Sequence, residues 1–186
     1  QELGGSVMVK AQLHAGGRGR AGGIRAAGSP TEAEEAAAAL LGKRLVTRQT
    51  GPEGVPVSRV LVEEAVGVKR ELYLGIVIDR AFKGPVVIAS DSGGMEIEEV
   101  AVASPEKIHR EGVNPFVGFR AFQGRRLARA IGVPAPLVGP AVQIMEWLYA
   151  LFVSKGCSLA EINPLVVTKE GKLLALDAKL DLEDDA

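Results

Sequence analysis

The sequence contains little cysteine and little histidine. Cys157 is the only cysteine in 186 residues, so no internal disulfide is possible, which fits a protein of a reducing compartment. The two histidines, His14 and His109, stand in no metal-binding spacing and beside no serine or cysteine with the context of a nucleophile. Chemistry on a histidine nucleophile would therefore need a histidine from another chain.

Long apolar runs and an excess of charge are also missing. No apolar run reaches the roughly 18 residues that a membrane span needs, and no secretory signal opens the chain. The formal net charge is −1 at pH 7, which argues against a general nucleic-acid-binding or membrane-surface role. We therefore expect a globular protein with neither a nucleic acid nor a membrane as its partner.

The most informative stretch is residues 10–23. It holds five of the 23 glycines and the basic residues Lys10, Arg18 and Arg20. Because glycine has no Cβ, the backbone N–H groups of such a loop can turn toward an anion. The pattern predicts a loop that covers phosphates. A flexible surface turn is the alternative, but a mere turn needs neither this length nor this charge.

Two common phosphate-binding motifs do not account for this loop. No Gly-Lys-Ser/Thr ending is present, which excludes the Walker loop. Gly17, Gly19 and Gly22 have the spacing of the dinucleotide fingerprint, but that fingerprint opens directly into a helix. Here residues 24–27 form a predicted strand, and the next helix starts only at Pro30. The loop is therefore predicted to join two strands and to lie over a triphosphate.

Two predicted strands near the end of the chain form a hairpin. Residues 160–167 and 172–179 are joined by residues 169–171, a three-residue loop with glycine in the left-handed position. Such a loop pairs Thr168 with Lys172. A two-residue loop would shift the register by one and send the polar residues of the two strands to opposite faces.

The hairpin places several polar side chains on one face. Asn163 falls opposite Asp177, and Glu161 falls opposite Lys179. Mg²⁺ takes hard oxygen ligands, typically one or two protein groups plus phosphates and water, so Asn163 and Asp177 are candidate metal ligands. A polar, solvated sheet face is the alternative. Pro164 inside the strand indicates an edge strand or a bulge.

A third candidate is the acidic end of the predicted strand at residues 59–63. Apolar residues that end in Glu63 can form the floor of an adenine site and bind its amino group or ribose. Glu71 follows eight residues later, within reach of the same sugar if the chain folds back. Solvated acids at a strand end are the alternative.

The remaining patterns predict a mixed α and β chain. The apolar spacing of residues 137–154 favours the core stripe of a long helix rather than a cofactor site. The other expected helices are residues 30–41, 105–110 and 123–131, and the other expected strands are residues 7–10, 45–47, 71–80 and 86–89.

Several stretches of the sequence, taken in order along the chain, resemble those of the β subunit of succinyl-CoA synthetases. Malate–CoA ligase β subunits share nearly all of these motifs. The stretches that carry the resemblance are residues 9–19, 41–47, 71–75, 161–169 and 176–179. The resemblance runs through the whole chain and covers only the ATP-grasp part of that family.

The resemblance implies an α+β chain with an ATP-grasp fold, in which two lobes, each a mainly antiparallel sheet with helices, grip a nucleotide. The small lobe would be residues 1–75 and the large lobe residues 76–186. Residues 1–5 look like the end of a helix that runs into a strand, so we expect the small lobe to be incomplete at its N-terminus. The family's CoA-ligase domain is not expected within this chain.

The resemblance also implies roles for individual residues. In the family, the nucleotide, ATP or GTP, is bound by residues matching Lys10, Gly17, Arg18, Gly19, Glu63, Val66 and Glu71. Residues matching Asn163 and Asp177 hold Mg²⁺, and the residue matching Glu161 lies near the phosphohistidine of the α subunit. Arg20 replaces a lysine that is common in the family, which keeps the charge and changes its geometry.

The implied activity is that of an ADP- or GDP-forming acid–CoA ligase of the tricarboxylic acid cycle, in the bacterial cytoplasm or the mitochondrial matrix. The γ-phosphoryl group would pass to a histidine of the α subunit, which also carries the CoA site, and the acid would be dicarboxylic. This chain alone is expected to be inactive. The alternatives are a malate–CoA ligase subunit, another ATP-grasp ligase acting as a single chain, and a non-catalytic nucleotide sensor or assembly subunit.

Overall fold

The structure is a computed structural model that describes residue 3 and residues 5–183. The chain divides into two compact units, Gln1–Val66 and Gly67–Ala186. Each unit combines an antiparallel sheet with helices, which confirms the predicted α+β class. The predicted helix end at residues 1–5 falls mostly outside the described residues.

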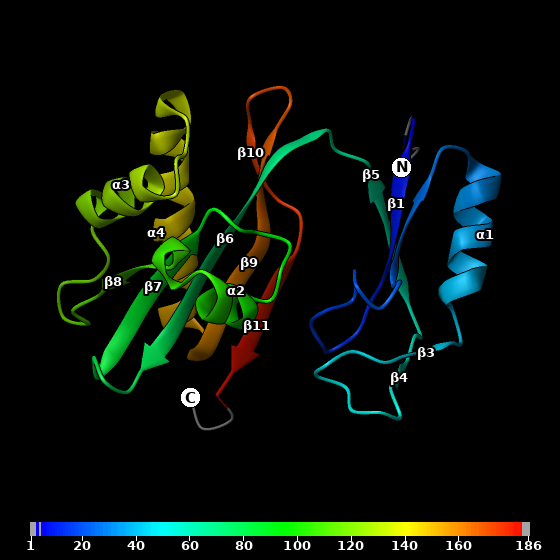
Figure 1. Ribbon diagram of the computed structural model, residues 1–186, viewed down its shortest axis with the longest axis horizontal. Helices are drawn as coiled ribbons and strands as arrows, with labels where there is room; N and C mark the ends of the chain where they lie inside the picture. Colours follow the sequence, from blue (N-terminus) through cyan, green and yellow to red (C-terminus); the bar gives the residue numbers. More distant parts are fainter. Residues whose placement is uncertain (1–2, 4, 184–186) are drawn as a thin grey trace. The chain divides into compact units, whose positions relative to one another are not determined.

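The first unit is a three-stranded sheet in the order β2-β1-β5 with one helix packed on it, and a separate two-stranded sheet of β3 and β4 (Figure 1). Its elements are β1 (Val7–Ala11), β2 (Ile24–Ala27), α1 (Pro30–Leu40), β3 (Arg44–Leu45), β4 (Val55–Pro56) and β5 (Val60–Glu64).

Alternation along β1 separates the core of this unit from its polar face. Val9 and Ala11 are fully buried and pack with Ala36 and Leu40 of α1. Because successive strand residues point to opposite faces, Lys10 points away from α1. Burial of apolar side chains against α1 thus fixes the direction in which Lys10 is presented.

The second unit is built on a sheet in the order β10-β9-β6-β7-β8, to which β11 adds by pairing with β9. Its elements are β6 (Val68–Asp79), β7 (Gly84–Ser90), α2 (Ile97–Ala103), the 3-10 helix η1 (Pro105–Lys107), β8 (His109–Gly112), α3 (Ala121–Ala130), the 3-10 helix η2 (Ala135–Leu137), α4 (Val138–Ser154), β9 (Cys157–Thr168), β10 (Leu173–Ala175) and β11 (Ala178–Leu182).

The boundary between the units lies nine residues before the predicted one. The predicted boundary after residue 75 falls inside β6, which runs unbroken over Val68–Asp79. Its backbone pairs with β9 along most of its length and with β7 from Tyr73 onward. These hydrogen-bonded ladders hold the whole of β6 in the second unit.

Two other predictions in this unit needed correction, and one helix was missed. The helix predicted at residues 105–110 is only the single turn η1, and the chain continues as β8. Helix α2 was not predicted at all. The strand predicted at residues 172–179 is interrupted between β10 and β11.

Helix α4 is the core helix of the second unit, as its apolar stripe predicted. Its buried residues Ala141, Met145, Leu148 and Phe152 share a cluster with Leu72 and other inward residues of the sheet. With the preceding turn, residues 135–154 are long and apolar enough to cross a membrane by length and composition alone, contrary to the prediction. The core helix of a globular protein meets the same criterion, and α4 packs in such a core.

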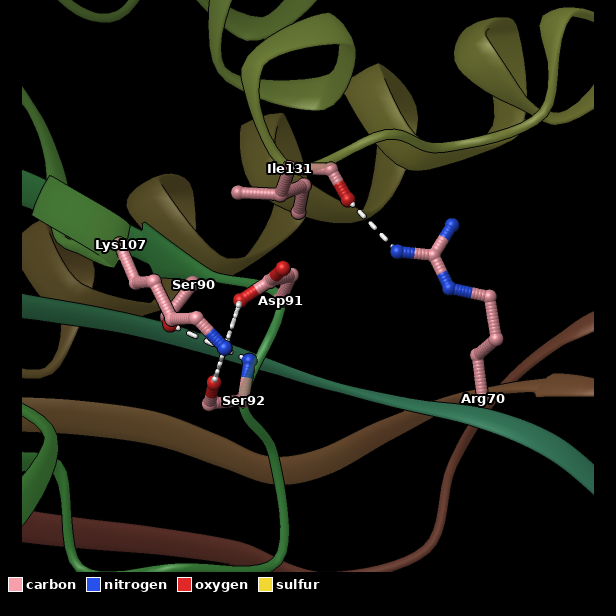
Figure 2. A network of polar contacts seen from close by, with 6 residues as sticks. All are labelled: Arg70, Ser90, Asp91, Ser92, Lys107 and Ile131. Carbon is pink, nitrogen blue, oxygen red and sulfur yellow. Dashed lines mark hydrogen bonds and ion pairs between the residues drawn. The ribbon is translucent and has the colours of Figure 1, made fainter. Parts of the chain in front are cut away.

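Arg70 of β6 ties the sheet to the end of α3 (Figure 2). Its guanidinium donates to the carbonyl of Ile131 at 3.0 Å, as drawn there. It also donates to the carbonyl of Gly132. The last carbonyls of a helix have no partner within it, and they carry partial negative charge. The Arg70 guanidinium therefore gives the carbonyls at the C-terminal end of α3 a positively charged hydrogen-bond donor.

Candidate functional site

The predicted site residues divide between the two units. The first unit contains Lys10, Gly17, Arg18, Gly19, Glu63 and Val66. The second contains Glu71, Glu161, Asn163 and Asp177. Each unit thus has its own group of candidate residues.

In the first unit, Lys10 and Glu63 form an ion pair. On the paired strands β1 and β5, Met8 stands opposite Glu63 and Lys10 opposite Leu61, so Lys10 and Glu63 are diagonal neighbours on one face. Lys10 Nζ contacts Glu63 Oε1, and the Lys10 side chain is only 8% exposed. The sheet therefore holds a nearly buried ammonium group where the glycine-rich loop begins.

The glycine-rich loop closes on its own stem. Ala11 N–H donates to the Gly23 carbonyl at 2.7 Å, and Arg18 Nη1 donates to the Ala11 carbonyl at 2.7 Å. Gly17 and Gly22 have φ values of +76° and +75°, which other residues rarely adopt. The loop joins two antiparallel strands and no helix follows it, so the spacing of the dinucleotide fingerprint is accidental.

Val66 lies at the end of the first unit, beyond β5. The backbone just before it is fixed by a hydrogen bond from the Ala65 N–H to the Ser6 carbonyl at 2.9 Å. The nucleotide-binding role that the resemblance implies for Val66 stays a prediction.

In the second unit, Glu71 lies against the loop formed by residues 91–96. The Gly93 N–H donates to the Glu71 carbonyl at 3.1 Å. A Cβ on Gly94, whose φ is +70°, would lie 2.4 Å from Glu71 Oε2. A Cβ on Gly93 would lie 2.4 Å from the Leu72 carbonyl oxygen. Only glycines allow this loop to come so close to β6.

Asn163 fastens the same loop to β9. Its Oδ1 accepts a hydrogen bond from the Gly94 N–H at 2.8 Å, and its Nδ2 donates to the Met95 carbonyl at 2.9 Å. Lys107 fixes the beginning of the loop, with its Nζ 3.4 Å from Ser92 Oγ and 3.8 Å from Asp91 Oδ1 (Figure 2). We call residues 91–96 the stapled loop, because both of its halves are tied down.

We expect Gly93→Ala to destabilise the protein, because the new methyl group would meet the backbone of β6 rather than a side chain that can move. The cost should be about 1–3 kcal/mol or more, the range of overpacked sites. Chemical denaturation measures it. Gly139→Ala is the control, since no atom lies within 4 Å of its Cβ position. If Gly93→Ala is as stable as the parent, the prediction that a Cβ at residue 93 clashes with the backbone of β6 is wrong.

A β-bulge places Asn163 beside β6. Leu72 pairs with Leu165 and Leu74 with Ile162, so two residues of β9 stand opposite one residue of β6. The bulge that Pro164 predicted is confirmed. The alternative of an edge strand is wrong, because β9 lies between β6 on one side and β10 and β11 on the other.

The hairpin has the predicted register. The Thr168 N–H donates to the Lys172 carbonyl at 2.8 Å, as the three-residue loop requires. The Asn163 N–H donates to the Asp177 carbonyl at 3.1 Å, so these two residues stand opposite each other where the ladder is interrupted between β10 and β11.

The side chains at this position offer the kind of oxygen ligands that magnesium binds. Asn163 Oδ1 and the Asp177 carboxylate are hard ligands, and an amide oxygen that accepts one hydrogen bond keeps a second lone pair. In the described part of the chain, no group of three or more His, Cys, Asp or Glu residues could hold a metal ion. A cation here would therefore need further oxygens from phosphates or water.

Glu161 is held by a tyrosine. Tyr73 Oη donates to Glu161 Oε2 at 3.1 Å, and Lys179 stands directly opposite Glu161 on β11. Burial raises the pKa of Glu161, and the charges of Glu98 and Glu96 add to this, whereas the Tyr73 hydrogen bond and Lys179 lower it. Burial, followed by the charge of Glu161, also raises the pKa of Tyr73, which therefore stays a neutral donor.

We expect Glu161→Gln to raise the thermal stability at pH 7.5. A folded-state pKa above the ordinary 4.5 means that folding disfavours the ionised carboxylate, so stability falls as pH rises from 4.5 through the raised pKa. Thermal melts should show a gain for the variant above this window and none below it. Glu170→Gln, exposed at the tip of the hairpin, should show no gain. A lower melting temperature for Glu161→Gln at pH 7.5 would show that the ionised Glu161 carboxylate does not destabilise the fold, and would contradict the prediction.

Sequence patterns alone identified neither Tyr73 nor the stapled loop as part of the site. Tyr73 lies 88 residues from Glu161 in sequence, and only the pairing of β6 with β9 brings them together. The adjacent glycines Gly93 and Gly94 follow the predicted strand at residues 86–89, and no role was assigned to them from the sequence. Two consecutive glycines after a strand were the signal of a close backbone approach.

The sequence is similar to curated proteins. A family model described as an ATP-grasp domain matches residues 1–167. Succinate–CoA ligase (ADP-forming) subunit beta of Exiguobacterium sibiricum is 56% identical over 100% of this chain and 48% of that protein. The protein of the same name from Geobacillus kaustophilus is 55% identical over 100% of this chain and 48% of its own length. The chain thus spans about half the length of the curated relatives it matches.

The fold is similar to solved structures of low sequence identity. An ATP citrate lyase from Methanothrix soehngenii, in complex with citrate and coenzyme A, aligns with a TM-score of 0.69 and 23% identity, over 97% of this chain and 39% of that one. A dinucleotide-forming acetyl-coenzyme A synthetase 1 from Ca. Korarchaeum cryptofilum aligns with a TM-score of 0.65 and 15% identity, over 95% of this chain and 76% of that one.

Proposed function

The chain belongs to the ATP-grasp domain family, which confirms the predicted fold. We propose that it is the nucleotide-binding part of a succinate–CoA ligase β subunit. The identity of 54–56% to relatives of that name, along the whole chain, supports the proposal. The activity belongs to a longer protein, since the chain spans about half of these relatives.

One observation carries the proposal beyond nucleotide binding. The hairpin presents Glu161 two residues from Asn163, whose side chain is a candidate metal ligand. An extra carboxylate near phosphates would repel them, so Glu161 has no evident task in binding the nucleotide. An acid that accepts the N–H of an imidazole, in contrast, fixes its tautomer and stabilises the cation that forms.

The first unit would bind the phosphates. The Lys10 ammonium, which is paired with Glu63 in this structure, and the backbone N–H groups of Gly17 and Gly19 offer positive charge and donors to anionic oxygens. Glu63 and Glu71 would contact the base and ribose. When bound, Mg²⁺ on Asn163 and Asp177 would neutralise and orient the phosphates.

The chemical step would be phosphoryl transfer to a histidine of a partner subunit. An imidazole nitrogen would bond to the γ-phosphorus while the bond to the β-phosphate oxygen breaks, which releases ADP or GDP. Glu161 would hold the other ring N–H. The phosphohistidine would then phosphorylate the acid, and CoA would displace phosphate to give the thioester.

A steady-state assay of the gene product with its partner subunit tests this function. We expect nucleoside diphosphate release that requires CoA and succinate together. A requirement for malate would favour the malate–CoA ligase alternative, and ATP–GTP competition would identify the nucleotide. Activity without the partner, with an amine in place of CoA, would instead favour a single-chain ligase and contradict the proposal.

A further inference from the structure

Tyr73 is placed in an unusual way for a core residue. It is only 1% exposed, yet it lies on the face of β6 opposite the apolar core that contains Leu72 and Leu74. Its hydroxyl donates to Glu161 Oε2 at 3.1 Å. Burial of the ring therefore fixes the position of a donor next to the carboxylate.

Gly75 makes this arrangement possible. It shares the face of Tyr73, and it pairs across the ladder with Glu161. A Cβ at this position would lie 2.4 Å from Tyr73 Oη and 2.9 Å from the ring carbon Cζ. The ring thus extends along β6 over a residue without a side chain and reaches the neighbouring strand.

The surroundings explain why the carboxylate needs this support. Glu96 and Glu98 act on Glu161 as like charges, and Lys179 acts as the opposing charge. Glu96 ends the stapled loop and Glu98 lies in the first turn of α2, and Asn163 anchors the loop just before them through Gly94 and Met95. Without the hydroxyl, repulsion would favour rotation of the carboxylate away from α2.

We propose that Tyr73 is a positioning residue for phosphoryl transfer: its hydroxyl holds Glu161 Oε2, so that Oε1 is presented to the imidazole of the partner subunit. The inference rests on the proposed function. Tyr73 contacts neither nucleotide nor imidazole in this scheme and acts only through Glu161. The competing explanation is that Glu161 only accepts the hydrogen bond of the buried Tyr73 hydroxyl and plays no part in phosphoryl transfer.

A double-mutant cycle separates these explanations. The gene product, assembled with its partner, is compared with Tyr73→Phe, Glu161→Gln and the double variant, using γ-labelled nucleotide in rapid quench. Tyr73→Phe should slow phosphohistidine formation about 10-fold or more, the scale on which lost orienting groups act. Its nucleotide dissociation constant should change less than about twofold, and in the Glu161→Gln background it should have almost no further effect.

Several results would overturn the inference. One is a transfer rate of Tyr73→Phe equal to that of the parent. Another is that Tyr73→Phe slows transfer by the same factor in the parent and in the Glu161→Gln background. Tyr149→Phe, the matched control on α4, should be unchanged, and nucleotide binding reports whether each variant is folded. If Tyr73→Phe does not fold, Gly75→Ala keeps the hydroxyl but removes its space, and an unchanged rate there refutes the inference. A parent that transfers no label refutes the proposed function instead.

Discussion

Glu161→Gln should slow phosphohistidine formation by about 10²-fold or more while nucleotide affinity stays the same. The side chain keeps its size and its hydrogen bond from Tyr73, but it loses the negative charge that stabilises an imidazolium. Rapid quench with labelled nucleotide measures formation and decay of the phosphohistidine separately. A loss of rate without a loss of affinity is the signature of an interaction made only in the transition state.

The control for Glu161→Gln is Glu170→Gln, on the exposed loop of the same hairpin, which should behave like the parent. If Glu161→Gln forms and uses phosphohistidine at the parent rates, Glu161 is only a polar residue paired with Lys179. Its resemblance-based role would then be wrong, even if the protein is a ligase.

Asp177→Ala should raise the Mg²⁺ concentration needed for half-maximal transfer by roughly 10- to 100-fold. The reason is its place opposite Asn163, where its carboxylate is the one charged candidate ligand that the hairpin offers to a hard cation. A Mg²⁺ titration of the transfer rate measures the change. The fold should persist, because Asp177 lies between β10 and β11 rather than in the apolar core.

Asp181→Ala is the matched control for Asp177→Ala. Asp181 lies four residues further along the hairpin, on β11, and its carboxylate is 3.3 Å from Lys179 Nζ. Its loss should leave the Mg²⁺ dependence unchanged. An unchanged dependence in Asp177→Ala itself would remove Asp177 from the metal site.

Local signals predicted the hairpin well, because a three-residue loop with a glycine determines the register of both strands. That register alone placed Asn163 opposite Asp177 and Glu161 opposite Lys179. The glycine-rich loop was predictable for a similar reason, since composition and flanking strands are local properties. In both cases the chemistry was encoded within about 20 neighbouring residues.

Contacts between distant segments could not be predicted in this way. Tyr73 meets Glu161 only because β6 pairs with β9 around a bulge. The stapled loop depends on the approach of Gly93 and Gly94 to β6, which no local pattern determines. Similarly, Pro105 signalled a helix start, but sheet pairing with β7 turned the residues after η1 into β8.

The most direct test of the proposed function omits CoA and the acid. The gene product and its partner subunit are mixed with γ-labelled ATP or GTP and Mg²⁺, quenched with base, and digested to locate the label. We predict an acid-labile, base-stable phosphate on one histidine of the partner subunit, which later addition of succinate and CoA removes. Absence of label on the partner, or label on a residue of this chain, would contradict the proposal.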